Sequence, residues 1–197
     1  MRDLALSYWE HQSFFGPADV AIIGAGLVGL TAALYLKQRR PNWRVVVLEH
    51  GSLPSGASTK NAGFACFGSI SEPLPDISLR GTFHYDHGYA YFRQLPDHRI
   101  LLGGGRNLDF AAEETTAPGL TPTVQRYLEN LLHEVIVPGR QPRINYRWSG
   151  VMGFGPALAP ILDWARPGVL AAVRCNGMGV ALGAGMAWQA AKLLAGT

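Results

Sequence analysis

The sequence predicts an α/β protein, in which a strand-helix-strand unit near the N-terminus is followed by short antiparallel strands and one helix. Residues 19–23 and 44–48 are apolar, β-branched runs that suit buried parallel strands. Between them, residues 30–37 are good helix formers, and a basic end with Pro41 behind it stops the helix. From residue 83 the pattern changes to short strands with alternating aromatic residues, which is typical of hairpins.

A glycine-rich turn joins the first strand to its helix. Gly24, Gly26 and Gly29 have the G-x-G-x-x-G spacing. The first glycine allows a tight turn, the second lets backbone N–H groups approach a pyrophosphate, and the third lets helix and strand pack closely. The N-terminus of the helix, with Leu27 and Val28 in its first turn, then faces the phosphates with unpaired donors and a partial positive charge.

An acidic residue closes the second strand. Glu49 lies about 20 residues past Gly29, where a carboxylate can accept both hydroxyls of an adenosine ribose. Its charge disfavours a ribose phosphate, so NADP is the less favoured ligand. His50 beside it is interpreted as a neighbour of solvent or of the adenine. Together, the two strands, the helix, the glycines and the acid predict a Rossmann-like dinucleotide-binding domain.

Composition narrows the class of protein. The chain has 197 residues and 48% apolar content, enough for a real core, and a net charge of +3 that is not clustered. We therefore expect no nucleic-acid or membrane-surface role. Cys66 and Cys175 lack C-x-x-C spacing and are interpreted as buried free thiols in a reducing compartment. The N-terminus lacks the order of a signal peptide, and three glycines interrupt the apolar run 20–36, which predicts a soluble cytoplasmic protein.

A long segment of small polar residues, 51–64, follows Glu49. It has little periodicity, so it is predicted to be a loop, and loops of this length in compact domains are usually functional. Its hydroxyl and amide groups are of the kind that a phosphate or ribitol chain needs.

The order of motifs along the chain resembles the D-amino-acid oxidase and glycine oxidase family of FAD-dependent oxidoreductases. The resemblance rests on the unit 19–49, on Gly56-Ala57-Ser58 with Asn61-x-Gly63, on Gly103-Gly104-Gly105, on Arg147-Trp148-Ser149-Gly150, and on Asn176-Gly177-Met178-Gly179. It implies FAD as the cofactor. It also implies that the last turn begins a helix facing the pyrimidine side of the flavin. The implied cofactor contacts are Ser58, Thr59, Asn61, Gly63, Gly177, Met178 and Gly179.

The middle of the chain departs from that family. Residues 71–76, with two prolines in three positions, lead almost directly into the hairpin region and are interpreted as a stiff linker. We infer that an internal block is absent, with a junction near residues 70–80. The predicted domains are an FAD-binding domain at 1–75 and 155–197 and a substrate-domain remnant at 76–154. The loss would expose sheet edges, which favours self-association into a homo-oligomer.

The remaining elements are predicted from local pattern. Residues 88–93 and 99–103 form a hairpin, and a helix runs from Thr121 to about residue 137 with a hydroxyl cap and an early proline. Residues 143–154 are predicted to be a strand. The chain then ends in a strand at 169–173 and a helix at 180–194.

The candidate catalytic residues lie in these strands. Tyr91 and Arg93 share one face of a strand and could supply a hydroxyl and a carboxylate anchor, whereas Arg147 and Trp148 could supply a second anchor and a wall. The alternatives are a core aromatic residue for Tyr91 and surface ion pairs for the arginines. In the resembled amino-acid oxidases an arginine grips the substrate carboxylate, and the matching position here is Met152.

Two other patterns are given little weight. His84 and His87 would lie on opposite faces of a strand, which disfavours a metal site. No serine, histidine and acid arrangement stands out either.

The predicted function is therefore the FAD-dependent oxidation of a C–N bond in a small amine or amino acid, with hydride transfer to flavin N5. The first alternative is a non-catalytic flavin- or dinucleotide-binding scaffold derived from such an enzyme. The second is an NAD-dependent dehydrogenase.

Overall fold

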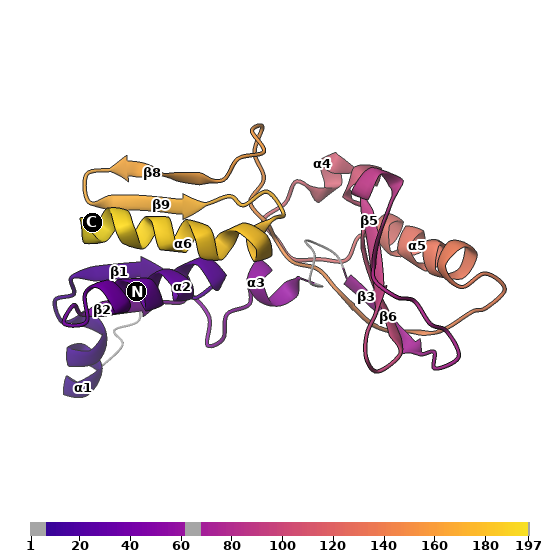
Figure 1. The fold of residues 1–197 in the computed structure, drawn as a ribbon, viewed down its shortest axis with the longest axis horizontal. Coiled ribbons are helices and arrows are strands. Elements are labelled where there is room, and N and C mark those ends of the chain that lie inside the picture. Colours follow the sequence, from indigo (N-terminus) through magenta and orange to yellow (C-terminus); the bar gives the residue numbers. More distant parts are fainter. Residues whose placement is uncertain (1–6, 62–67, 197) are drawn as a thin grey trace. The chain divides into compact units, whose positions relative to one another are not determined.

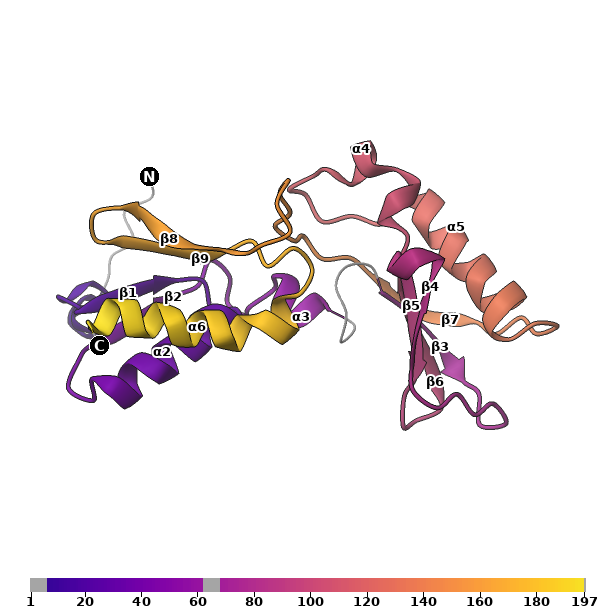
Figure 2. The same cartoon turned by 45° about the horizontal axis from the view of Figure 1, so that its top comes forward.

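The computed structural model describes residues 7–61 and 68–196, and the chain divides into two compact units (Figures 1 and 2). Unit 1 comprises residues 1–54, 161–173 and 181–197, and unit 2 comprises residues 55–160 and 174–180. These bounds differ from those of the predicted domains, whose roles in binding cofactor and substrate stay predictions.

Unit 1 contains the predicted strand-helix-strand unit. Strand β1 (Val20–Ile23) pairs in parallel with β2 (Val45–Leu48), and helix α2 (Leu27–Arg39) connects them. The C-terminal helix α6 (Gly179–Ala195) contributes Ala191 and Ala195, which are buried with Leu36 of α2. Small alanine side chains allow this close approach of the two helices, whose neighbouring positions are visible in both ribbon views. The predicted mixed α/β fold with a parallel sheet is confirmed.

Unit 1 also contains an antiparallel hairpin, which was predicted only in part. Strand β9 (Val169–Val173) matches the predicted strand, but it pairs with β8 (Ile161–Arg166), which was not predicted. The two strands form an antiparallel sheet of their own, and Gly168 adopts a φ of +77° in the turn between them.

A short N-terminal segment completes unit 1. It consists of α1 (Tyr8–Glu10) and the π-helix η1 (His11–Phe15). The guanidinium of Arg44 donates hydrogen bonds to the backbone carbonyls of Gln12, Ser13 and Pro17, which ties this segment to the start of β2.

Unit 2 is built on a five-stranded antiparallel sheet in the order β4-β5-β6-β3-β7. Its strands are β3 (Gly68–Pro73), β4 (Thr82–Tyr85), β5 (Ala90–Gln94), β6 (Arg99–Gly104) and β7 (Ile144–Trp148). The predicted hairpin of β5 and β6 is confirmed, whereas the strand predicted at 143–154 ends at Trp148. The short helices are α3 (Ala57–Lys60), η2 (Asp86–Gly88), η3 (Arg106–Leu108) and α4 (Phe110–Glu113).

One helix covers one face of this sheet. It begins as α5 (Pro122–Asn130) and continues as the π-helix η4 (Leu131–Ile136), in agreement with the predicted range. The predicted hydroxyl cap is wrong, because the hydroxyl of Thr121 donates to Glu113 and makes no capping hydrogen bond. Val124, Leu128 and Leu132 are fully buried against Ile100 and Leu102 of β6. Their recurrence at helical spacing therefore marks the core of unit 2.

The linker predicted at 71–76 is wrong for its first half. Ser71, Glu72 and Pro73 belong to β3, which pairs with both β6 and β7. Pro73 is tolerated because it is the last residue of the strand, beyond an irregularity in the register after Ile70. The two prolines therefore did not exclude a strand before them, as the prediction of a linker assumed.

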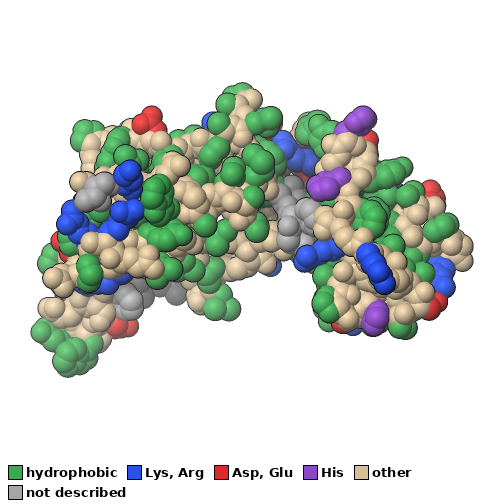
Figure 3. Space-filling model, viewed as in Figure 1, with side chains coloured by type: hydrophobic (Ala, Val, Ile, Leu, Met, Phe, Trp, Pro, Cys, Tyr) green, Lys and Arg blue, Asp and Glu red, His purple; other side chains and the backbone are tan. Residues whose placement is uncertain are grey.

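No helix within residues 7–61 and 68–196 is long and apolar enough to cross a membrane. On the face shown in Figure 3, Lys and Arg side chains lie in small separate groups, and hydrophobic side chains reach the surface in both units.

Replacing Leu128 with alanine tests the core of unit 2. Because Leu128 is 0% exposed, Leu128→Ala should lower the free energy of unfolding by about 2–5 kcal/mol. Urea denaturation followed by circular dichroism measures this change. The control Leu193→Ala removes a leucine that is 48% exposed on α6 and should change stability by at most about 0.5 kcal/mol. Equal losses in both variants would contradict the assigned core.

Candidate functional site

The glycine turn of unit 1 is held tightly to the end of β2. Gly24 adopts a φ of +98°, and its N–H donates a 2.7 Å hydrogen bond to the carbonyl of Leu48. A Cβ on Gly29 would lie 2.1 Å from the carbonyl oxygen of Gly24. Glycine is therefore required at both places, by backbone conformation at the first and by close approach at the second.

Glu49 completes this turn. The N–H of Ala25 donates a 2.7 Å hydrogen bond to Glu49 Oε2, and the N–H of Gly51 donates to Oε1 at 3.4 Å. These bonds, led by the one from Ala25, lower the pKa of the Glu49 carboxyl. A backbone donor of the turn thus holds a carboxylate oxygen of the chain itself, and the binding of phosphate oxygens by the turn stays a prediction. His50 is exposed in the bend that follows.

The first turn of α2 packs against α6. A Cβ on Gly183 of α6 would lie 3.1 Å from Leu27 Cδ2 and 3.3 Å from Val28 Cγ2. The side chains of Leu27 and Val28 are therefore directed at a helix. Leu27 and Val28 would therefore contact a phosphate only through their backbone N–H groups. No side chain caps these groups, because the N-cap residue is Gly26.

The predicted loop after Glu49 contains one helical turn, α3, in unit 2. Thr59 Oγ1 donates to the carbonyl of Gly56 at 3.1 Å, and Asn61 Nδ2 donates to the carbonyl of Ser58 at 2.6 Å. Thr59 and Asn61 thus stabilise the turn itself. Gly63, like Cys66, lies outside the described residues, and the cofactor roles of Ser58, Thr59 and Asn61 stay predictions.

The C-terminal glycine motif forms a tight turn in unit 2. Asn176 has a φ of +49° and Gly177 a φ of +83°, and the N–H of Met178 donates to the carbonyl of Cys175 at 2.9 Å. Asn176 is 8% exposed. Its Oδ1 accepts from the N–H of Gly155, and its Nδ2 donates to the carbonyl of Ala159. This side chain therefore fixes the turn from which α6 begins at Gly179.

Three of the four predicted catalytic residues share one face of the unit 2 sheet. Tyr91 and Arg93 are two residues apart on β5 and therefore point to the same face of the sheet. Trp148 packs with Leu101 and Tyr91 in one cluster. The indole N–H of Trp148 donates to the carbonyl of Lys60 at 2.7 Å. Tyr91 is only 6% exposed, and Arg93 Nε is buried without a hydrogen-bond partner in the described part of the chain.

Arg147 lies on the other face, the one covered by α5. It forms a 3.1 Å ion pair with Glu129 of that helix. This is the surface ion pair that the sequence left open as an alternative. Arg147 is therefore separated from Trp148 by the sheet, and the catalytic roles of all four residues stay predictions.

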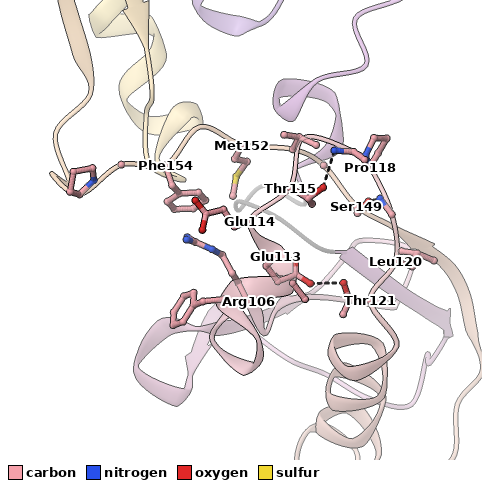
Figure 4. Close-up of a pocket in the computed structure, with 18 residues that line it drawn as sticks. Arg106, Glu113, Glu114, Thr115, Pro118, Leu120, Thr121, Ser149, Met152 and Phe154 are labelled. Carbon is pink, nitrogen blue, oxygen red and sulfur yellow. Dashed lines mark hydrogen bonds between the residues drawn. The ribbon is translucent and has the colours of Figure 1, made fainter.

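A cavity of about 890 Å³ lies in unit 2, between residues 106–121 and 149–156 (Figure 4). Arg106, Glu114, Met152 and Phe154 line it, and none of the four predicted catalytic residues does. Sequence reasoning reached Met152 but missed Arg106. The signal that could have found it is its position directly after Gly103-Gly104-Gly105, where a strand ends in two glycines of positive φ.

Two further predictions concern single side chains. Burial raises the pKa of the Cys175 thiol, which is half-buried. His84 lies in β4 and His87 in η2, and residues 7–61 and 68–196 contain no group of three or more His, Cys, Asp and Glu side chains that could hold a metal.

The parallel strand-helix-strand unit with its glycine turn and acid defines a dinucleotide-binding protein. Comparison with known proteins identifies the family. The sequence matches the DAO family of FAD-dependent oxidoreductases over residues 19–81 and 69–193, and the chain belongs to this family. FAD is the cofactor that this membership indicates. The two matched segments overlap at 69–81.

Individual relatives cover only parts of the chain. A probable malate:quinone oxidoreductase of Stenotrophomonas maltophilia is 31% identical over 96 residues, which are 44% of this chain and 17% of that protein. A thiamine thiazole synthase of Schizosaccharomyces pombe is 33% identical over 57 residues, which are 29% of this chain and 17% of that protein. The chain thus spans about a sixth of the length of these relatives.

A solved structure supports the fold. L-proline dehydrogenase from P. horikoshii aligns with a TM-score of 0.56 and 15% sequence identity. The alignment covers 77% of this chain and 43% of that one. At this identity the likeness concerns the fold alone.

Replacing Gly29 with alanine tests the glycine turn. The added Cβ would meet the carbonyl oxygen of Gly24, so Gly29→Ala should displace the turn and weaken FAD binding by at least about tenfold. Titration of FAD with detection of flavin fluorescence measures the affinity. The control Gly185→Ala places a methyl group on α6 where no atom lies within 4 Å, and it should stabilise the chain by about 0.5–1 kcal/mol without changing FAD affinity. Unchanged affinity in Gly29→Ala would contradict the assignment of the turn.

Proposed function

We propose that this FAD-dependent oxidoreductase oxidises a C–N bond of an amine or amino acid by hydride transfer to flavin N5. The observation that carries the choice of bond is the chemistry of the unit 2 cavity. Its lining includes the carboxylates of Glu113 and Glu114 and apolar side chains, but no histidine. Oxidation of a hydroxyl group calls for a base near neutral pKa, whereas an amine can arrive already uncharged. Carboxylates also attract an ammonium group before it loses its proton.

The residues that would hold FAD are those of the glycine turns. The backbone of Gly24, Gly26 and Gly29 would bind the pyrophosphate, and Glu49 would bind the ribose. Gly177, Met178 and Gly179 open a 17-residue helix, whose N-terminus would stabilise negative charge near N1 and C2=O of the flavin. When bound, FAD supplies the two-electron acceptor at N5.

Ser58, Thr59, Asn61 and Gly63 remain proposed contacts from the resemblance. His50 is a proposed neighbour of the adenine.

The proposed tasks of the substrate residues are to orient and to desolvate. Tyr91 and Trp148 form a rigid wall, since both are packed around Leu101 and Trp148 is hydrogen-bonded to Lys60. Arg93 on the same face is the carboxylate anchor that the sequence predicted, but it does not line the unit 2 cavity, which makes it a weaker candidate for that task than a cation of the cavity lining. Arg147 already has a carboxylate partner, Glu129, and is the weakest of the four candidates.

The relatives differ in the bond that their names imply. The solved neighbour is named for L-proline, an amino acid, and a sequence relative is named for malate, a hydroxy acid. The proposal follows the first, on the chemistry of the cavity.

A non-catalytic flavin-binding scaffold is the second candidate. Two observations favour it: the family match splits into two segments at 69–81, and the chain spans 43% of the solved neighbour. Loss of an internal block would remove part of the pockets that turnover needs.

The absorption spectrum of the purified protein separates these candidates. We expect flavin bands that bleach under anaerobic conditions when glycine, proline, alanine of either hand or a primary amine is added, because electrons then reside on the flavin. Gly29→Ala, loaded with the same FAD concentration, serves as the control and should retain less colour. Flavin bands that no amine bleaches would favour the scaffold. Bleaching by malate alone would contradict C–N oxidation, and a colourless protein stabilised by NAD would favour a dehydrogenase.

A further inference from the structure

We propose that the unit 2 cavity binds a zwitterionic amino acid with a bulky apolar side chain, its carboxylate on Arg106 and its ammonium group on Glu114. The role of this ligand as the substrate rests on the proposed function. The binding itself rests on the geometry of the cavity alone, which lies wholly within unit 2.

Arg106 is held in place by its surroundings. Its guanidinium carbon lies 3.8 Å from the ring centroid of Phe154 and 5.2 Å from that of Phe110. Just before it, a Cβ on Gly105 would lie 3.1 Å from the ring of Tyr127, so the backbone of this segment is close to α5. The position of the guanidinium is therefore set before any ligand binds.

The guanidinium remains able to bind an anion. Within the residues that the structure describes, no carboxylate lies at ion-pairing distance from Arg106. Stacking on aromatic rings uses the face of a guanidinium and leaves the N–H groups at its edge to donate. These groups match the two oxygens of a carboxylate, which they can bind in bidentate fashion.

Glu114 supplies the opposite charge. Figure 4 shows its carboxylate directed toward the guanidinium of Arg106 and the ring of Phe154. Glu113 accepts a hydrogen bond from the hydroxyl of Thr121 instead, and is thereby turned to a different partner. One cation and one available carboxylate thus face the same space. These charges are complementary to the carboxylate and the ammonium group of an amino acid.

The rest of the lining sets the size of the ligand. Leu120, Val151, Met152 and Phe154 present apolar surface, and the volume of about 890 Å³ lies in the range of sites for drug-sized molecules. Glycine or alanine would leave most of it filled with water. Met152 adds a flexible apolar side chain to this lining.

Ligand pairs that differ by one charged group test the proposal. The full chain is titrated by isothermal titration calorimetry, with and without FAD, using D-phenylalanine, L-phenylalanine, 3-phenylpropionate and phenethylamine. Phenylalanine of at least one hand should bind at least about tenfold more tightly than either singly charged analogue, because each loses one charge-assisted contact.

The variants assign each contact to its residue. Arg106→Gln should remove the difference between phenylalanine and phenethylamine, and Glu114→Gln should remove the difference between phenylalanine and 3-phenylpropionate. The control Arg126→Gln removes an exposed arginine of α5 outside the cavity and should leave all affinities unchanged. Arg106→Lys, which keeps the charge but not the planar fork, should retain an intermediate preference and guards against misfolding of Arg106→Gln.

Several results would overturn the proposal. They are the absence of binding by any probe, equal affinities for all probes, or preferences that survive both Arg106→Gln and Glu114→Gln. Equal affinities would mean that Arg106 and Glu114 neutralise each other in solution. Selective binding in a protein whose flavin is never reduced would uphold the site and defeat the proposed oxidation instead.

Discussion

The close approach of backbone to backbone at the glycine turn is the constraint on which the organisation of unit 1 depends. Gly29 lies so near the carbonyl of Gly24 that no Cβ fits between them, and Gly24 is bonded in turn to Leu48 at the end of β2. One short segment thereby joins both strands and the helix. The N–H of Ala25 is left pointing at the edge of the sheet, where the carboxylate of Glu49 accepts it. The same compactness brings backbone N–H groups of the turn to the place where the proposed FAD pyrophosphate would bind.

Elements whose cause is local could be predicted from the sequence. The βαβ unit and helix α5 follow from apolar patterns within each segment and, for α5, from the proline in its first turn. Strand β8 was missed because its residues, Ile161 to Arg166, do not alternate clearly and acquire their structure by pairing with β9. The strand character of Ser71 to Pro73 was missed for a similar reason, since it comes from partners on both sides, β6 and β7. Long-range pairing overrode local preference in both places.

The candidate site likewise has a part that could be predicted from local sequence and a part that depends on long-range contacts. The glycines and Glu49 could be found because their spacing reflects one continuous motif. The cavity could not, because it is formed by two segments, 106–121 and 149–156, that approach only in the fold. The sequence grouped Tyr91 with Arg93, which do share a face, but it also grouped Arg147 with Trp148, and these two point to opposite faces of the sheet. Consecutive side chains in a strand point to opposite faces of the sheet. Residues that are adjacent in a sequence motif therefore need not contribute to the same site.

The position of β3 bears on the inference that an internal block is absent from this chain. The two family matches overlap at residues 69–81, so the inferred junction falls partly within β3. This strand is central, paired on both sides, and it contains a register irregularity after Ile70 in each pairing. A bulge absorbs a change in strand length without breaking the ladder on either side. Ser71 then adds a hydrogen bond from the N–H of Ile100 to its hydroxyl, so the buried backbone next to the irregularity stays satisfied. If a block is absent here, the antiparallel sheet of unit 2 accommodates its loss within a strand rather than in a loop, because the ladder stays paired on both sides of the irregularity.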